Sequence, residues 1–483
     1  MEIKNLIVQE GCKLSDALQV ITREASGICF VVRGLKLVGV ITDGDIRRAF
    51  LAGAKIQDPV ELAMQKNYLS LPINTTLIEI QKHIGNYKNI PILNEVGELV
   101  DIATSSRYHQ IPLVQPVFDG NELEYVTDCI LTGWLSSQGK YVREFESKFA
   151  KYVGAKNALA VSNGTVALHL ALAALRIGPG DEVLVPNLTF AATINAVLYV
   201  GATPVLVDVD PVSMAINPSA AERLISQNTR AIIVVHLYGH PADMDYIKIL
   251  ASSHNLLVIE DCAEALGSKY KGEHVGAFGD VATFSFFGNK TITTGEGGMV
   301  LFKDSALHQR ANILRDHGMS PDRRYWHEEV GFNYRLTNLQ AAVGVAQLER
   351  VDYFIQRKRW IADQYNLMLS NFPQLSLPQD GRDTYNSYWL YTVVINQELS
   401  VQRDDILSTL KKFGIEARPV FFPLHRMPPY SKFQNKDTYF PVSEWLSDCG
   451  ISLPSSITLT EAEIKRTCEC LKEALGMAIT KLH

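Results

Sequence analysis

Lys290 has the sequence surroundings best suited to chemistry. It stands among small, hydroxylated and aromatic residues in the run SFFGNKTITTGEGG at positions 285–298. The apolar run at 281–284 predicts a buried strand, so the lysine should lie at the edge of a core. Lost hydration makes the neutral amine easier to reach, which a Schiff-base lysine requires. From this run alone, a lysine that extends to solvent from a glycine-rich loop is an equally good interpretation.

Two earlier runs supply what a pyridoxal phosphate lysine needs. Asp261 ends the apolar run LLVIED, where a carboxylate could pair with a protonated pyridine nitrogen. Gly164 and Thr165 open a predicted helix, whose free N–H groups and dipole suit a phosphate. Taken singly, Asp261 could be a strand-end cap and Gly164–Thr165 a plain helix start. The order phosphate loop, aspartate, lysine indicates a pyridoxal phosphate site.

These runs resemble the DegT/StrS-type sugar-nucleotide aminotransferases, a fold-type I pyridoxal phosphate family. The resemblance extends from about Ile111 to the C-terminus and includes the run NYRLTN at 333–338. It implies that Lys290 is the catalytic lysine, that Asp261 keeps the pyridine nitrogen protonated, and that Glu264 bonds near the ring hydroxyl. The phosphate contacts that it implies are Gly164, Thr165, Ser285 and, from the partner subunit of a homodimer with shared active sites, Asn333. Phe190 would stack on the pyridine ring, although core packing is an alternative for this residue.

The resemblance also implies a reaction. We expect amination of a nucleotide-linked 4-keto-6-deoxyhexose, with GDP-4-keto-6-deoxymannose as the first choice and L-glutamate as the donor. Sugar dehydratases of the family carry histidine at the position of Lys290, so the lysine favours amination. The alternatives are a UDP- or dTDP-linked keto sugar and, in another class, a non-catalytic protein that senses nucleotides.

Four residues fall where the family approaches the sugar nucleotide: Trp134, Ser136, Arg418 and His425. Trp134 and Ser136 lie in the run GWLSSQG, which could equally be a turn that ends a helix and buries its tryptophan. Arg418 stands beside a proline and could simply brace the fold.

Residues 1–110 differ in pattern from the rest and contain two copies of a strand–turn–strand unit, at 27–41 and 89–103. They resemble a tandem pair of cystathionine-β-synthase (CBS) domains, with copies at 1–58 and 59–110. In that family a Thr-x-x-Asp motif holds the ribose of an adenine nucleotide, and Thr42 and Asp45 match it. The second copy reads TSSR at 104–107 and lacks the acid. Thr42 and Asp45 could instead only cap a helix.

The fold class expected for the remainder is α/β. Near-continuous apolar runs at 183–186, 203–208 and 231–236 alternate with helical segments, which indicates a mostly parallel sheet covered on both faces. The resemblance implies seven strands in a large domain, 111–365, and a small α+β domain, 366–483. Residues 303–365 are expected to be helical.

Composition narrows the functional classes. The 483 residues are 47% hydrophobic and 20% charged, with a net charge of −6, which does not indicate a nucleic-acid surface. The seven cysteines are scattered and predict free thiols in a reducing cytoplasm. His236, His240 and His254 are not spaced as ligands, and no metal is expected. No apolar run is long enough to span a membrane, so no membrane partner is expected.

Overall fold

Two units make up the chain in the computed structural model, which describes residues 3–24, 26–75, 77–84, 86–104, 110–399, 401–434 and 438–480. One unit comprises residues 1–111 with 412–414, and the other comprises 112–411 with 415–483. The boundaries expected at 58 and 365 fall inside these units, and 365 lies within a helix; both stay predictions. No described helix is both long and apolar enough to cross a membrane.

The first unit contains the same three-stranded arrangement twice. In each copy the first strand pairs in parallel with the second, which forms an antiparallel hairpin with the third. The strands are β1 (Ile7–Gln9), β2 (Ile28–Arg33), β3 (Lys36–Thr42), β4 (Leu71–Pro72), β5 (Asn89–Leu93) and β6 (Leu99–Thr104). The helices are α1 (Leu14–Glu24), α2 (Asp43–Leu51) and α3 (Leu77–Ile84). This repetition agrees with a duplicated module; residues 105–107 of the second copy lie outside the described residues.

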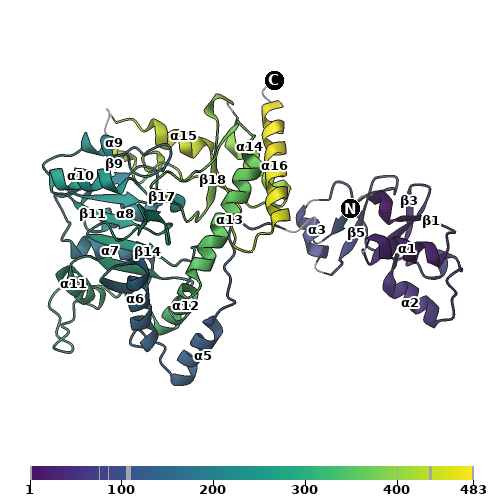
Figure 1. The fold of residues 1–483 in the computed structure, drawn as a ribbon, viewed down its shortest axis with the longest axis horizontal. Helices are drawn as coiled ribbons and strands as arrows, with labels where there is room; N and C mark the ends of the chain where they lie inside the picture. The colour runs from purple at the N-terminus through teal and green to yellow at the C-terminus, as the bar shows by residue number, and fades with distance from the viewer. Residues whose placement is uncertain are drawn as a thin grey trace. The chain divides into compact units, whose positions relative to one another are not determined.

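A seven-stranded sheet forms the centre of the second unit (Figure 1). Its order is β7 (Asn157–Val161), β15 (Gly298–Phe302), β14 (Val281–Ser285), β11 (Leu257–Asp261), β10 (Thr229–Val235), β8 (Glu182–Pro186) and β9 (Thr203–Val207). All of its strands are parallel except β15, which runs antiparallel to β14 and β7. The mostly parallel sheet expected from the sequence is confirmed.

Helices cover both faces of this sheet. They are α5 (Glu122–Thr132), α6 (Lys140–Val153), α7 (Gly164–Ala174), α8 (Ala191–Tyr199), α9 (Pro218–Glu222), α10 (Met244–His254), α11 (Ser305–Arg315), α12 (Asn338–Leu348) and α13 (Val351–Leu369). Side chains of α7 and α11 form one core with β7 and β15, while those of α6, α12 and α13 form another around Phe145, Phe149 and Phe284. Alternate side chains of β8, β9 and β10 enter two further cores, one on each face of the sheet, which explains the near-continuous apolar runs of these strands.

A smaller sheet follows α13 in the chain. Its order is β16 (Leu375–Ser376), β18 (Tyr391–Ile395), β20 (Gly450–Leu453) and β19 (Arg418–Pro419). Its helices are α14 (Arg403–Lys412), α15 (Pro441–Cys449) and α16 (Glu461–Thr480). A further small sheet joins β12 (Lys269–Tyr270), β13 (Glu273–His274) and β17 (Thr384–Tyr385), so the chain after α13 also pairs with the large-sheet region.

The segment 316–337 departs from the expected helices. It folds back on itself through isolated bridges between Asp316 and Asn333 and between Met319 and His327. Gly318 has a φ of +70°, and a Cβ there would meet the carbonyl oxygen of Glu329 at 1.8 Å. A helix cannot include this close backbone approach, so α11 ends before it.

Candidate functional site

Lys290 lies in the loop between β14 and β15, and its side chain is 14% exposed. Its Nζ donates a hydrogen bond to Oε1 of Glu264 at 3.3 Å. The same nitrogen lies 3.9 Å from the ring centroid of Trp389. The lysine is therefore held in a partly buried position between a carboxylate and an aromatic face, and does not extend freely into solvent.

Asp261 ends β11 and is buried. Its Oδ2 accepts a hydrogen bond from Oγ1 of Thr193 at 2.9 Å, and its Oδ1 accepts one from the backbone N–H of Ala263 at 3.2 Å. Burial raises the pKa of Asp261, while these bonds and the nearby charge of Lys290 oppose that rise. A cationic partner would stabilise the ionised form of a carboxylate whose ionisation is disfavoured by burial.

Glu264 follows β11 and is also buried. Besides Lys290, it accepts the backbone N–H of Tyr238 at its Oε2, at 3.0 Å. Burial raises the pKa of Glu264, and the charge of Lys290 lowers it. Glu264 thus connects the lysine loop to the segment that follows β10.

The expected phosphate contacts meet at the start of α7. Asn163 caps this helix by accepting the N–H of Val166 at 3.0 Å. Gly164 packs so closely on Ser285 that a Cβ at 164 would lie 2.8 Å from the serine Cβ. The close approach brings Gly164 and Ser285, from distant parts of the chain, to one place, with half-buried Thr165 next in the helix.

Phe190 and Asn333 are the remaining expected contacts of the cofactor. Phe190 is the N-cap residue of α8; its side chain is 59% exposed, and its ring centroid lies 5.8 Å from that of Phe421. Asn333 is exposed, and its Oδ1 accepts hydrogen bonds from Nε and Nη2 of Arg335 at 3.3 and 3.2 Å. Its expected role in a partner subunit stays a prediction.

The four expected substrate contacts differ in character. His425 is buried, and its ring nitrogens bond to Asn187 at 2.9 Å and to Glu444 at 3.0 Å, so both are engaged within the protein. The exposed Arg418 pairs with Glu416 at 3.0 Å. The other two, Trp134 and Ser136, are exposed and precede α6.

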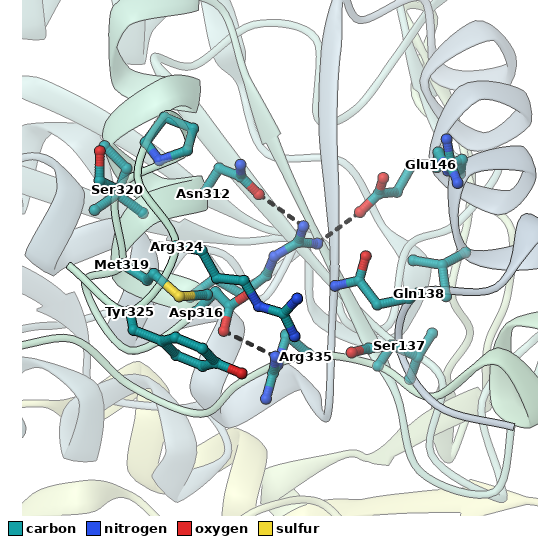
Figure 2. A pocket seen from close by; sticks show the side chains of 16 residues that line it. Ser137, Gln138, Glu146, Asn312, Asp316, Met319, Ser320, Arg324, Tyr325 and Arg335 are labelled. Carbon is teal, nitrogen blue, oxygen red and sulfur yellow. Dashed lines mark hydrogen bonds and ion pairs between the residues drawn. The ribbon is translucent and has the colours of Figure 1, made fainter. Parts of the chain in front are cut away.

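Next to that exposed stretch is a pocket of about 900 Å³ (Figure 2). Its lining residues include Ser137, Gln138, Arg143, Glu146, Arg315, Asp316, Arg324, Tyr325 and Arg335. Arg315 pairs with Glu146 at 2.6 Å, and Arg335 pairs with Asp316 at 2.8 Å. Four arginines against two carboxylates leave the pocket with an excess of positive charge. Arg335 also bridges to Val161, just before the phosphate loop.

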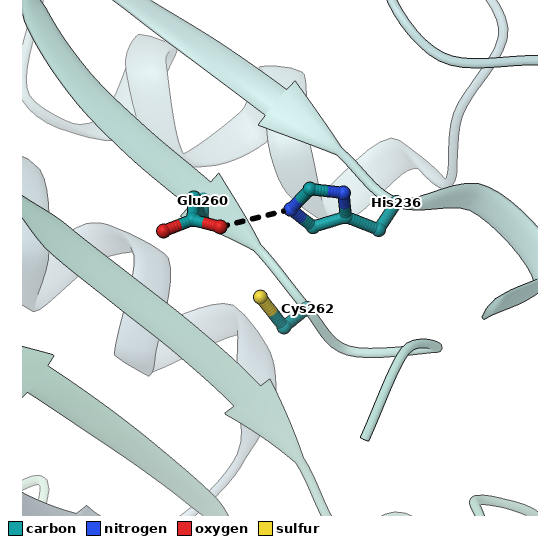
Figure 3. A group of neighbouring side chains, drawn as sticks. All are labelled: His236, Glu260 and Cys262. Atoms are coloured by element: carbon teal, nitrogen blue, oxygen red, sulfur yellow. Dashed lines mark hydrogen bonds and ion pairs between the residues drawn. The ribbon is translucent and has the colours of Figure 1, made fainter. Parts of the chain in front are cut away.

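His236, Glu260 and Cys262 form a buried group whose ligand atoms lie within 4.8 Å of one another (Figure 3). Glu260 accepts Nε2–H of His236 at 3.1 Å and the backbone N–H groups of Gly276, Phe278 and Gly279. His236 accepts the N–H of Ala242 at Nδ1, at 3.1 Å. Burial raises the pKa of the Cys262 thiol. The imidazole and carboxylate lone pairs are engaged within the protein, so this group braces β10 and β11 and does not form a metal centre.

In the first unit, Thr42 and Asp45 form a capping box at the start of α2. The buried Asp45 accepts both the N–H and the hydroxyl of Thr42 at Oδ2, and Arg48 and Gln65 at Oδ1. Burial opposes ionisation, but these four hydrogen bonds outweigh it and lower the pKa of Asp45. A ribose would have to replace one of these donors, so helix capping accounts for the motif as it stands.

Residues 116–472 match the family model described as DegT/DnrJ/EryC1/StrS aminotransferase family. The chain belongs to this family. Residues 1–52 match the CBS domain, so a CBS domain precedes the aminotransferase region. The cofactor of this family is pyridoxal phosphate, and the chain is a pyridoxal phosphate-dependent sugar aminotransferase.

Individual relatives cover the same region. GDP-perosamine synthase of Escherichia coli O157:H7 is 48% identical over 363 residues, 75% of this chain and 98% of that protein. GDP-perosamine synthase of Caulobacter vibrioides is also 48% identical, over 367 residues, 76% of this chain and 98% of that protein. Among solved structures, DesV of S. venezuelae superposes with a TM-score of 0.69 at 35% identity, and covers 74% of this chain and 94% of its own.

The residues in place fit pyridoxal phosphate. Asp261 is a buried carboxylate that a protonated ring nitrogen would stabilise, Lys290 presents its amine nearby, and the Gly164–Ser285 contact leaves backbone N–H groups at a helix start for a phosphate. Phe190 offers an uncovered aromatic face.

Sequence reasoning missed three residues of the site: Tyr238, Thr193 and Trp389. Tyr238 follows a parallel strand, β10, as Glu264 follows β11, and this position at the carboxyl end of a strand was a usable signal. Thr193 lies in the first turn of α8, and its hydroxyl oxygen is 3.1 Å from that of Thr189, which precedes the helix. Trp389 gave no signal, because it comes from a part of the chain remote from the lysine loop.

Proposed function

We propose that this enzyme aminates C4 of a GDP-linked 4-keto-6-deoxyhexose, GDP-4-keto-6-deoxymannose, to give GDP-perosamine for surface polysaccharide synthesis, with L-glutamate as donor. The observation that carries the choice of substrate is 48% identity to two GDP-perosamine synthases over almost their whole length. For the chemistry, the supporting observation is the amine of Lys290, which lies within 3.3 Å of Glu264 beside the buried Asp261.

Bound pyridoxal phosphate supplies the electron sink for the carbon from which a proton is removed. Lys290 binds the cofactor through Nζ; when that nitrogen is free, it takes up and returns the proton at the substrate carbon. Asp261 holds the proton on the pyridine nitrogen, and Thr193 orients its carboxylate. Glu264 bonds near the ring hydroxyl and also positions the lysine. Gly164, Thr165 and Ser285 bind the phosphate, and Phe190 packs on the ring.

We place the nucleotide of the substrate near Trp134 and Ser136. The arginine-rich pocket beside them supports this choice, because a diphosphate needs positive charge and Tyr325 in its lining could stack on a base. In this proposal Arg418 also contacts the substrate. His425, whose ring nitrogens bond to Asn187 and Glu444, shapes the substrate site from within the protein. In this proposal the enzyme works in the cytoplasm as a homodimer, and Asn333 of each subunit contributes to the phosphate site of the other.

A panel of GDP-, UDP- and dTDP-linked 4-keto-6-deoxyhexoses, each incubated with glutamate and followed by mass spectrometry, tests the substrate. We expect the GDP sugar to be aminated most efficiently. Amination of only the UDP or dTDP sugar would overturn the choice of nucleotide and leave the reaction class intact. No amination of any of them would count against the function itself.

A further inference from the structure

Trp389 lies directly against the amine that does the chemistry. Nζ of Lys290 is 3.9 Å from the centroid of the indole ring and 3.3 Å from Oε1 of Glu264. The tryptophan is only 5% exposed. A cation above an indole face is attracted by the ring quadrupole, and the attraction grows when water is excluded. Two groups that favour an ammonium therefore meet at one point.

Trp389 is itself fixed by three contacts, two to its indole ring and one to its backbone. Its Nε1–H donates to the carbonyl oxygen of Asn289 at 2.8 Å, so the ring is tied to the residue next to the lysine. Its backbone carbonyl oxygen accepts Nζ of Lys358 at 3.0 Å. Its ring stacks nearly parallel to that of Tyr238, with centroids 6.1 Å apart and an interplanar angle of 8°. The flexible chain of Lys290 thus meets a rigid surface.

We propose that Trp389 is a positioning residue for Lys290, and that its indole face and Glu264 together hold the ε-ammonium whenever that nitrogen is not bonded to the cofactor. Transamination requires the lysine to leave the cofactor and return to it. A free four-carbon side chain explores many rotamers, and a fixed aromatic surface restricts it to one. The inference rests on the proposed function in one respect, which is that Lys290 is the lysine that binds the cofactor.

A purely structural Trp389 makes a different prediction. Removal of a core indole would lower thermal stability but would leave the titration of the lysine amine unchanged. Removal of a cation–π partner disfavours the protonated amine, so that the amine should react at lower pH.

The experiment measures that titration in the full-length holoenzyme. Excess glutamate converts the cofactor to its amino form and frees Lys290, whose amine is then labelled with trace acetic anhydride across a pH series. Mass spectrometry of the Lys290 peptide gives the extent of labelling at each pH. Variants are Trp389→Leu, which removes the aromatic face, and Trp389→Phe, which keeps a weaker one. The matched control is Trp360→Leu, because Trp360 stacks on a different cation, Arg357, with the guanidinium carbon 3.9 Å from the ring centroid.

We expect half-maximal labelling of Lys290 to occur at a pH lower by about 1 in Trp389→Leu, lower by less in Trp389→Phe, and unchanged in Trp360→Leu. An unchanged Lys290 titration in Trp389→Phe and Trp389→Leu holoenzyme, or an equal fall in Trp360→Leu, would overturn the inference. Failure of the proposed function is distinguishable: in the wild type, labelling of Lys290 would then be the same with and without glutamate. If Trp389→Leu does not fold, Trp389→Phe alone decides.

Discussion

Asp261 shows how the site controls charge at the level of single residues. Its carboxylate is buried, its pKa is raised by that burial, and among the described residues it accepts hydrogen bonds from one hydroxyl and one N–H. Asp45 in the first unit is also buried, but four hydrogen bonds lower its pKa. Within the described part of the chain Asp261 thus accepts fewer hydrogen bonds than Asp45, which supports its proposed role in binding a cationic group.

Replacement of Lys290 by alanine should abolish transamination and leave pyridoxal phosphate bound without a covalent link. The physical reason is that, in the proposed function, the amine of Lys290 both bonds the cofactor and moves the proton. Borohydride treatment followed by peptide mass spectrometry checks the link, and product formation checks the activity. A variant that still yields a reduced lysine adduct and turns over substrate would refute the assignment.

Asp261→Asn should lower kcat by at least about 100-fold while the protein stays folded, because an amide does not hold a proton on the pyridine nitrogen. Thr193→Val is a milder companion, which removes one hydrogen bond and keeps the carboxylate. Steady-state kinetics and circular dichroism measure the two effects. Near-normal turnover by folded Asp261→Asn would rule out the role given to this residue.

At the level of elements, the site gathers at the carboxyl ends of parallel strands. Phe190 follows β8, Tyr238 follows β10, Asp261 ends β11 and Ser285 ends β14, and the order β14-β11-β10-β8 makes these ends neighbours. The order of the strands in the sheet, and not their order in the sequence, therefore brings together the residues proposed to bind the phosphate and the ring of the cofactor.

Helix α13 contributes a buried lysine, Lys358, which bonds to the backbone of Trp389. Lys358 is 3% exposed and donates to the carbonyl oxygens of Trp389 and Ser455, both at 3.0 Å. Burial lowers the pKa of Lys358 to about 7. In the unfolded chain its pKa is about 10.4, so between these values the unfolded state binds the additional proton.

It follows that stability should rise with pH between about 7 and 9, by up to about 1.4 kcal/mol per pH unit from this group. Below about pH 7, Lys358 is protonated in both the folded and the unfolded state, so it no longer contributes to the change of stability with pH. Lys358→Met keeps most of the volume and should remove this part of the slope. Urea denaturation of both proteins across pH 6–9 gives the difference, and parallel slopes would contradict the shifted pKa.

At the level of the whole molecule, an active site shared between subunits can be tested by complementation. A mixed dimer of Lys290→Ala and Asn333→Ala chains would contain one site free of both changes. After subunit exchange at equal concentrations, random pairing should restore about a quarter of wild-type activity. Mixing Lys290→Ala with the Lys290→Ala/Asn333→Ala double variant is the control and should restore none. Absence of recovery despite demonstrated exchange would count against shared sites.

The unit at residues 1–111 should modulate or assemble the enzyme and not complete its chemistry. We expect a chain that begins near Ile111 to bind pyridoxal phosphate and aminate sugar. An inactive but folded truncation would show that the first unit is needed for the reaction.

Adenine nucleotide binding at Thr42 and Asp45 is a separate prediction. Calorimetry with AMP and ATP should give heat with the full chain and none with Asp45→Ala. Because Asp45 also caps α2, Asp45→Asn serves as the variant with less effect on folding. No heat with the wild type would leave Asp45 as the structural cap that its four hydrogen bonds already form.

Lys290, Asp261 and Gly164 could be predicted from the sequence, because each belongs to a pattern of neighbouring residues: an apolar strand, then small or polar residues at its end. The same local patterns determined the parallel sheet and the repeated strands of the first unit. The turn at 316–337 was missed because a close approach between Gly318 and Glu329 is not local.

Only the tertiary structure decided what surrounds these residues. Trp389 reaches the lysine loop from 100 positions beyond Asn289, its hydrogen-bond acceptor, and its backbone carbonyl oxygen is held by Lys358 on a helix between them. Asp45 matches a ribose-binding motif in sequence, yet Gln65 comes from 20 positions away to occupy its carboxylate. Sequence patterns extend over a few residues, whereas burial, charge and hydrogen-bond partners depend on which distant segments the fold packs against one another.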